Sequence, residues 1–90
     1  MVTRDMIIHN ESGFHIRPAQ LFTETAGRYV SNVTVTVKGT AITVDGKSIL
    51  GLMTLGLSKG AEITIAASGP DEEAALQALK ELADSGFGES

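Results

Sequence analysis

The chain has 90 residues, which predicts one domain spanning residues 1–90 and leaves no room for a second. Hydrophobic residues make up 42% of the chain and charged residues 20%, enough for a small core, which excludes intrinsic disorder. The lack of cysteine excludes a disulfide framework and a thiolate zinc site, and we expect neither a metal nor another cofactor.

Charge and hydropathy narrow the range of partners. The seven Lys and Arg residues form no basic run, so we expect no nucleic-acid binding. Six of the eleven acidic residues lie within residues 71–90, a pattern typical of a solvated helix face. No apolar stretch approaches the roughly 20 residues that cross a bilayer, and residues 1–10 lack the layout of a secretory signal. We therefore expect a cytoplasmic protein that does not insert into a membrane.

Strand and helix signals alternate in the first half of the chain. Residues 6–8 predict a strand that ends in the turn-prone residues 10–13. A helix is expected from Ile16 to Ala26, because Pro18 suits a first turn and Gly27 suits a helix end. Alternating valines at 33–37, a turn, and residues 41–44 predict a hairpin with one buried face.

The second half adds two helices and a strand. Ser48 is a good N-cap for a helix of two turns or fewer over Ile49–Thr54, and residues 61–67 alternate as a strand does. A final helix from about 71 to 85 has acidic residues in its first turn. The order β-α-β-β-α-β-α predicts an α+β fold, an open-faced β-sandwich with a four-stranded antiparallel sheet and three helices packed on one face.

Residues 13–19, Gly-Phe-His-Ile-Arg-Pro-Ala, hold the conspicuous chemistry. His15 precedes the first expected helix, where the backbone N–H groups of Ile16 and Arg17 and the helix dipole favour an anion. A neutral imidazole nitrogen is a nucleophile toward phosphorus, and Arg17 can add a bidentate contact to a phosphoryl group. The alternative is that His15 only caps the helix and Arg17 is a surface charge. His9 is expected to be a surface residue of the first strand.

The same seven residues resemble the phosphorylation-site motif of the histidine-containing phosphocarrier proteins (HPr). Residues 46–57, Gly-Lys-Ser-Ile-Leu-Gly-Leu-Met-Thr-Leu-Gly-Leu, are similar to that family's second signature, and the resemblance covers essentially the whole chain. It implies a carrier of the phosphoenolpyruvate-dependent sugar phosphotransferase system, not a turnover enzyme. The carrier would accept a phosphoryl group from phospho-enzyme I on Nδ1 of His15 and pass it to an enzyme IIA. Arg17 would stabilise the phosphoryl oxygens.

Ser48 has two interpretations. Its role as a helix N-cap is sufficient to explain the residue. The resemblance adds a regulatory role, phosphorylation by an HPr kinase/phosphorylase, with a transcription regulator as a further partner. A phosphate there would disfavour the desolvation of an apolar contact with enzyme I.

The apolar run from Ile49 to Leu57 exceeds what a short helix can bury, so part of it is expected to serve as a partner surface. We expect Leu50 and Met53 to point outward and to dock partners together with Lys47. The residues expected to point inward are Ile49, Leu52 and Leu55. Phe14 and Phe22 are expected to flank the site, and solvated surface is the simplest interpretation of Arg28 and Lys59.

Some residues depart from the family pattern and leave the function open in part. Ile16 stands where a small or hydroxyl residue is usual, and Glu11-Ser12 is an unfamiliar loop. The tail from Asp84 to Ser90 resembles the nitrogen-related phosphotransferase carriers, which have a mainly regulatory role.

An acylphosphatase-like hydrolase and a regulatory binding protein with an idle His15 are two rival functions for a chain of this size. A monomer fits a shuttle that exposes one face to several partners.

Overall fold

The computed structural model describes residues 1–9 and 13–87, so the expected turn at 10–12 and the tail beyond 87 lie outside the described residues. The elements are β1 (Val2–Ile7), α1 (Ile16–Gly27), β2 (Asn32–Val37), β3 (Thr43–Asp45), α2 (Ile49–Thr54), β4 (Glu62–Ser68) and α3 (Glu72–Asp84). The predicted order β-α-β-β-α-β-α is confirmed.

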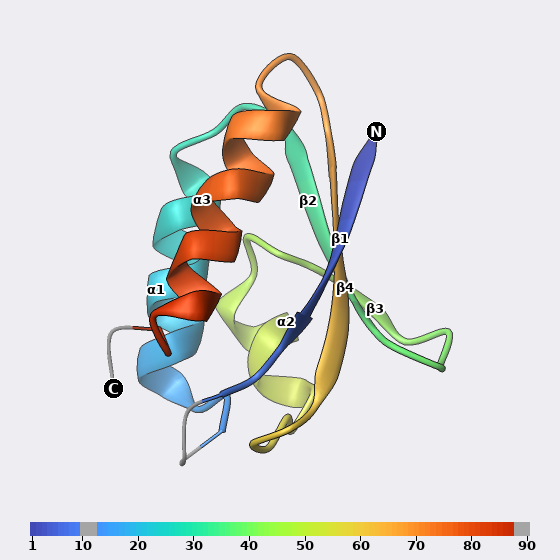
Figure 1. The fold of residues 1–90 in the computed structure, drawn as a ribbon, viewed down its shortest axis with the longest axis vertical. Helices are drawn as coiled ribbons and strands as arrows, with labels where there is room; N and C mark the ends of the chain where they lie inside the picture. Colours follow the sequence, from blue (N-terminus) through green and yellow to red (C-terminus); the bar gives the residue numbers. More distant parts are fainter. Residues whose placement is uncertain (10–12, 88–90) are drawn as a thin grey trace.

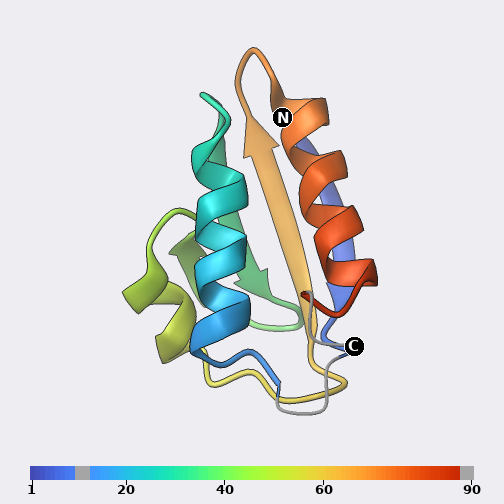
Figure 2. The same cartoon turned by 90° about the vertical axis from the view of Figure 1, so that its left-hand side faces the viewer.

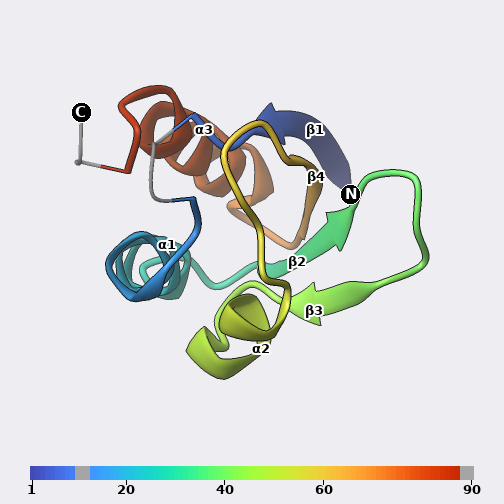
Figure 3. The same cartoon turned by 90° about the horizontal axis from the view of Figure 1, so that it is seen from below.

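The strands form one antiparallel sheet in the order β1-β4-β2-β3. All three helices lie on one side of this sheet, as the view from below in Figure 3 shows, while α1 and α3 run along its length (Figures 1 and 2). No helix of the described residues covers the other face of the sheet. The fold is therefore the predicted open-faced sandwich, and none of the helices in the described part of the chain is long and apolar enough to span a bilayer.

Alternation along the strands explains the two faces. Val33 and Val35 on β2 and Ile63 and Ile65 on β4 are each at most 1% exposed, because they point toward the helices. Thr34 and Thr64, which lie between these residues and point to the uncovered face, are polar, and Thr36 Oγ1 lies 2.8 Å from Thr43 Oγ1 on that face. The sheet thus buries apolar side chains on one face only, as antiparallel sheets commonly do.

Two strands differ from the sequence prediction. Strand β1 begins at Val2 and not at residue 6, because its first residues pair with β4, Val2 with Ala67 and Asp5 with Thr64. Strand β3 is only Thr43–Asp45, because the Thr40 hydroxyl accepts from the Ile42 N–H, 3.1 Å away, and extends the preceding turn. Pairing and turn chemistry override the local hydrophobic pattern in both places.

A hydrogen-bonded tie joins the α1–β2 loop to the start of α3. The Asp71 carboxylate accepts from the backbone N–H groups of Val30 and Ser31, each at 2.9 Å, and from the Ser31 hydroxyl. The Asp71 N–H donates in return to Ser31 Oγ at 3.2 Å. The hydrogen bonds from the Ser31 hydroxyl and the Val30 N–H hold the pKa of Asp71 below its ordinary value.

Replacing Asp71 with Asn is expected to lower the melting temperature at pH 7. The folded-state pKa of Asp71 lies below its unfolded value of about 3.9, so the stabilisation is fully present above that pH. It is lost as the pH falls through the folded-state pKa. Thermal melts of wild type and Asp71→Asn should therefore differ at pH 7, and the difference should narrow as the pH falls below the unfolded-state pKa, whereas exposed Glu24→Gln should match wild type at pH 7. A difference in melting temperature between wild type and Asp71→Asn that does not narrow at low pH would contradict this linkage.

Candidate phosphoryl-transfer site

The loop that carries His15 is held by its first two described residues. Gly13 has φ +72°, and a Cβ there would lie 2.6 Å from the Leu57 carbonyl oxygen and 2.9 Å from Cα of Ser58. The next N–H, that of Phe14, donates to the same Leu57 oxygen at 2.9 Å. The backbone therefore approaches the turn after α2 so closely that only glycine fits at position 13.

His15 is the N-cap residue of α1. Its backbone is extended, with φ −94° and ψ −163°, and its carbonyl accepts the first helical hydrogen bond from the Ala19 N–H at 3.0 Å. The N–H groups of Ile16 and Arg17 precede that bond, so helix geometry aims them out of the N-terminal end. His15 is half-buried, and Arg17 is exposed. The predicted helix start is confirmed, and this end of α1 carries an imidazole, two backbone N–H donors and, in its first turn, the exposed side chain of Arg17.

Helix α2 packs against α1 (Figure 3) and carries both exposed and buried apolar side chains. Leu50 is 76% exposed and Met53 39% exposed, whereas Leu52 is fully buried. The partly buried Ile49 and Leu55 pack against the core, so the predicted inward and outward positions are confirmed. Ile16, on α1, is 57% exposed. The side chains of Ile16, Leu50 and Met53, here called the exposed apolar set, lie on neighbouring helices.

Ser48 caps α2 as its sequence context predicts. Its Oγ accepts from the Gly51 N–H at 3.1 Å, and the residue is half-buried. The neighbouring Lys47 Nζ donates to the Tyr29 carbonyl at 2.8 Å, which ties the start of α2 to the end of α1. Lys47 is thus a structural tie as well as a candidate docking charge.

Three aromatic rings lie directly beneath the His15 loop. Phe14 and Phe22 are 4% and 0% exposed, so they support the site from the core and do not flank it at the surface. The third ring is Phe87, beyond α3, which is 1% exposed and contacts Phe14. The sequence prediction missed Phe87 because it assigned this residue to a tail beyond the helix.

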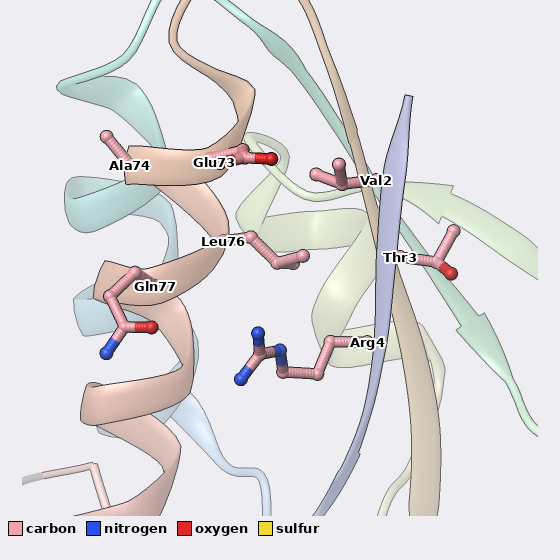
Figure 4. Close-up of a pocket in the computed structure, with 7 residues that line it drawn as sticks. All are labelled: Val2, Thr3, Arg4, Glu73, Ala74, Leu76 and Gln77. Atoms are coloured by element: carbon pink, nitrogen blue, oxygen red, sulfur yellow. The ribbon is translucent and has the colours of Figure 1, made fainter.

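The other imidazole, His9, is exposed and lies past the end of β1, on the connection that leads to His15, and not on the strand as the sequence predicted. The described residues contain no cluster of three groups that could hold a metal. A shallow groove of about 530 Å³ lies between β1 and α3; Arg4 extends from β1 toward α3 in Figure 4, and Gln77 of α3 is part of the lining. Its lining includes no described residue of the His15 loop or of α2.

A charged pair occupies the uncovered face of the sheet. The Thr64 hydroxyl donates to Asp5 at 2.8 Å, and Lys38 Nζ lies 3.1 Å from the same carboxylate. These contacts hold the pKa of Asp5 below its usual value, and the Asp5 carboxylate raises the pKa of Lys38. This pair therefore belongs to the face opposite the helices and not to the His15 loop.

Comparison with known proteins agrees with this geometry. The family model of the PTS HPr component phosphorylation site matches residues 2–85. The chain therefore belongs to the HPr family, the phosphocarriers of the phosphotransferase system.

Solved structures support the assignment. HPr of Thermoanaerobacter tengcongensis is 41% identical with a TM-score of 0.92, and the match covers 100% of this chain and 99% of that one. HPr of Bacillus anthracis is 35% identical with a TM-score of 0.83, over 91% and 95% of the two chains. Crh of Bacillus subtilis, a catabolite repression protein whose crystals hold a swapped dimer, is 37% identical with a TM-score of 0.73, over 96% and 97%.

Substituting Gly13 tests how tightly the loop is held. Gly39, with φ +84° and open space where a Cβ would lie, is the matched control. Gly39→Ala is expected to cost only the left-handed backbone penalty, about 1–2 kcal/mol. Gly13→Ala adds a clash with backbone atoms of Leu57 and Ser58, so its loss in urea unfolding should be clearly larger. Equal losses would show that the close approach does not constrain the loop.

Proposed function

We propose that the chain acts as a single carrier domain that accepts a phosphoryl group from phospho-enzyme I on His15. It then passes the group to an enzyme IIA of the phosphoenolpyruvate-dependent sugar phosphotransferase system. The observation that carries this proposal is the position of His15 at the N-terminal end of α1, on a loop held by Gly13 and Phe14. The chain is a relay and not a turnover enzyme, because the group it accepts leaves only by transfer to the next protein.

The transfer chemistry uses groups at this end of α1. A ring nitrogen of His15, Nδ1 by the family resemblance, attacks phosphorus as the donor's bond to the phosphoryl group breaks. The N–H groups of Ile16 and Arg17 stabilise the phosphoryl oxygens, and the Arg17 guanidinium adds charge during transfer. Because Ile16 lacks a hydroxyl, the donors at its position come from the backbone alone. The half-buried position keeps the phosphoryl group accessible to the acceptor.

The exposed apolar set, together with Lys47 just before α2, is the proposed docking surface for enzyme I and enzyme IIA. Leu50 and Met53 on α2 are exposed where most large apolar side chains of the fold are buried. Helix α2 packs on α1, so partners that cover these side chains also approach His15. A monomer in the cytoplasm, presenting this end to one partner at a time, fits such a relay.

Intact mass measured after incubation with enzyme I and phosphoenolpyruvate tests the carrier role. Wild type should gain one phosphoryl group, about 80 Da, that is lost on brief acid treatment, because the phosphorus–nitrogen bond is acid-labile. His15→Ala should gain none. His9→Ala, which removes the other imidazole, should behave as wild type. A label that survives loss of His15 would overturn the proposal.

We further propose that Ser48 is a regulatory phosphorylation site for an HPr kinase/phosphorylase, and that a transcription regulator recognises the modified form. Ser48 already accepts a helical N–H through its Oγ, so a phosphate is compatible with the cap. Its charge would lie next to the apolar helix that docks partners. Desolvation of that charge would weaken the complex with enzyme I.

Charge at position 48 can be separated from capping. Asp and Asn are both good N-caps, so Ser48→Asp and Ser48→Asn should melt alike. Ser48→Asp is expected to raise the KM for enzyme I roughly tenfold through the cost of desolvating the charge, while Ser48→Asn stays near wild type. Steady-state phosphotransfer at varied carrier concentration gives both values. The same KM in the two variants would remove the proposed docking effect.

The alternative is a carrier with a mainly regulatory role, as in the nitrogen-related phosphotransferase branch. The 37% identity to Crh of Bacillus subtilis, a catabolite repression protein, supports a regulatory role as the alternative. The mass experiment run with a sugar-branch and a nitrogen-branch enzyme I separates the two, because the cognate donor labels His15 faster.

A further inference from the structure

The chain reverses direction immediately after α3. Gly86 has φ +71° and Phe87 has φ +56°, both in the left-handed region, and Phe87 is the one non-glycine residue with positive φ among residues 1–9 and 13–87. The Phe87 N–H donates to the Leu82 carbonyl at 2.9 Å, and the Gly86 N–H donates to the Ala83 carbonyl at 3.0 Å. A strained backbone persists only where its surroundings fix it, and here it places an aromatic side chain in the core.

The Phe87 ring contacts the residue that precedes His15. Phe14 lies edge-on to Phe87, with ring centroids 5.2 Å apart and planes at 84°. Phe14 also lies edge-on to Phe22, at 6.0 Å and 75°. These are favourable aromatic geometries, and all three rings are at most 4% exposed.

The two contacts differ in what they join. Phe22 belongs to α1, so its contact with Phe14 lies within the loop and helix that present His15. Phe87 comes from the other end of the chain and joins that unit to α3. The Phe14 N–H bond to Leu57 fixes the backbone of this residue, and Phe87 fixes its ring.

We propose that Phe87 is a positioning residue for phosphoryl transfer, acting on His15 through Phe14. This inference rests on the proposed carrier function of His15. One peptide bond joins Phe14 to His15, so a shift of the Phe14 ring moves the imidazole relative to the N–H groups of Ile16 and Arg17. In-line transfer depends on placement of the reacting atoms to within a fraction of an ångström.

Phe87→Leu tests this inference. Leucine carries the same cost as phenylalanine in the left-handed backbone region and fills most of the volume of the Phe87 ring. The fold is therefore kept while the edge-on ring contact is lost. The matched control is Leu76→Ala, because Leu76 is 4% exposed near the opposite end of α3, beside the groove shown in Figure 4. Three quantities are measured for each protein: the melting temperature, kcat and KM with enzyme I, and the His15 ring signals in proton–nitrogen NMR spectra.

Phe87→Leu is expected to shift the His15 ring signals and to lower kcat roughly tenfold, with the KM for enzyme I within about twofold of wild type. Leu76→Ala should lose at least as much melting temperature and change neither the ring signals nor kcat. Unchanged ring signals and kcat in Phe87→Leu, or the same changes in Leu76→Ala, would overturn the inference. If wild type itself accepts no phosphoryl group, the carrier proposal fails, and the ring signals alone decide whether Phe87 positions His15.

Discussion

The close approach of Gly13 and Phe14 to the turn after α2 is the constraint on which the His15 site depends. A phosphocarrier has opposing requirements, because the reactive imidazole must be reachable while its place in space is defined. The chain meets both by burying the residue before His15 and leaving His15 itself half-buried. The Phe14 N–H bond to Leu57 and the packed rings of Phe14, Phe22 and Phe87 hold the loop from the core side.

The apolar residues of α2 also combine buried and exposed side chains. Leu52 faces the core and holds the helix down, whereas Leu50 on the same six-residue helix is largely exposed. Exposed apolar surface is a liability for a free protein, and on α2 it is confined to Leu50 and Met53. A short capped helix can do both, since it buries one apolar side chain in the core and exposes another to solvent. The cap at Ser48 therefore stabilises the helix that carries the proposed docking surface.

Much of this fold could be predicted from local patterns. The alternation of Val33 and Val35, or of Ile63 and Ile65, has a period of two that only a half-buried strand satisfies. Ser48 before an apolar run and His15 before Pro18 mark helix starts at single-residue precision. These features depend on neighbours in the sequence, and so the sequence alone reveals them.

The features that sequence patterns miss depend on contacts between distant parts of the chain. Asp71 suggests charge at a helix start, but its carboxylate instead binds the backbone of Val30 and Ser31. The first half of β1 exists because β4 pairs with it. Phe87 carries a usable signal, since a glycine at a helix end followed by an apolar residue is typical of a helix-terminating turn that packs back on the helix.

The uncovered face of the sheet differs from the helix side in its side chains. The hydroxyls of Thr36 and Thr43 bond to one another there, and the Asp5–Lys38 pair lies on the same polar face. The proposed partner contacts lie on the helix side of the sheet. The uncovered face is the natural place to attach a fluorophore or a tether, so that the protein can be followed through a relay without obstructing the end that carries His15.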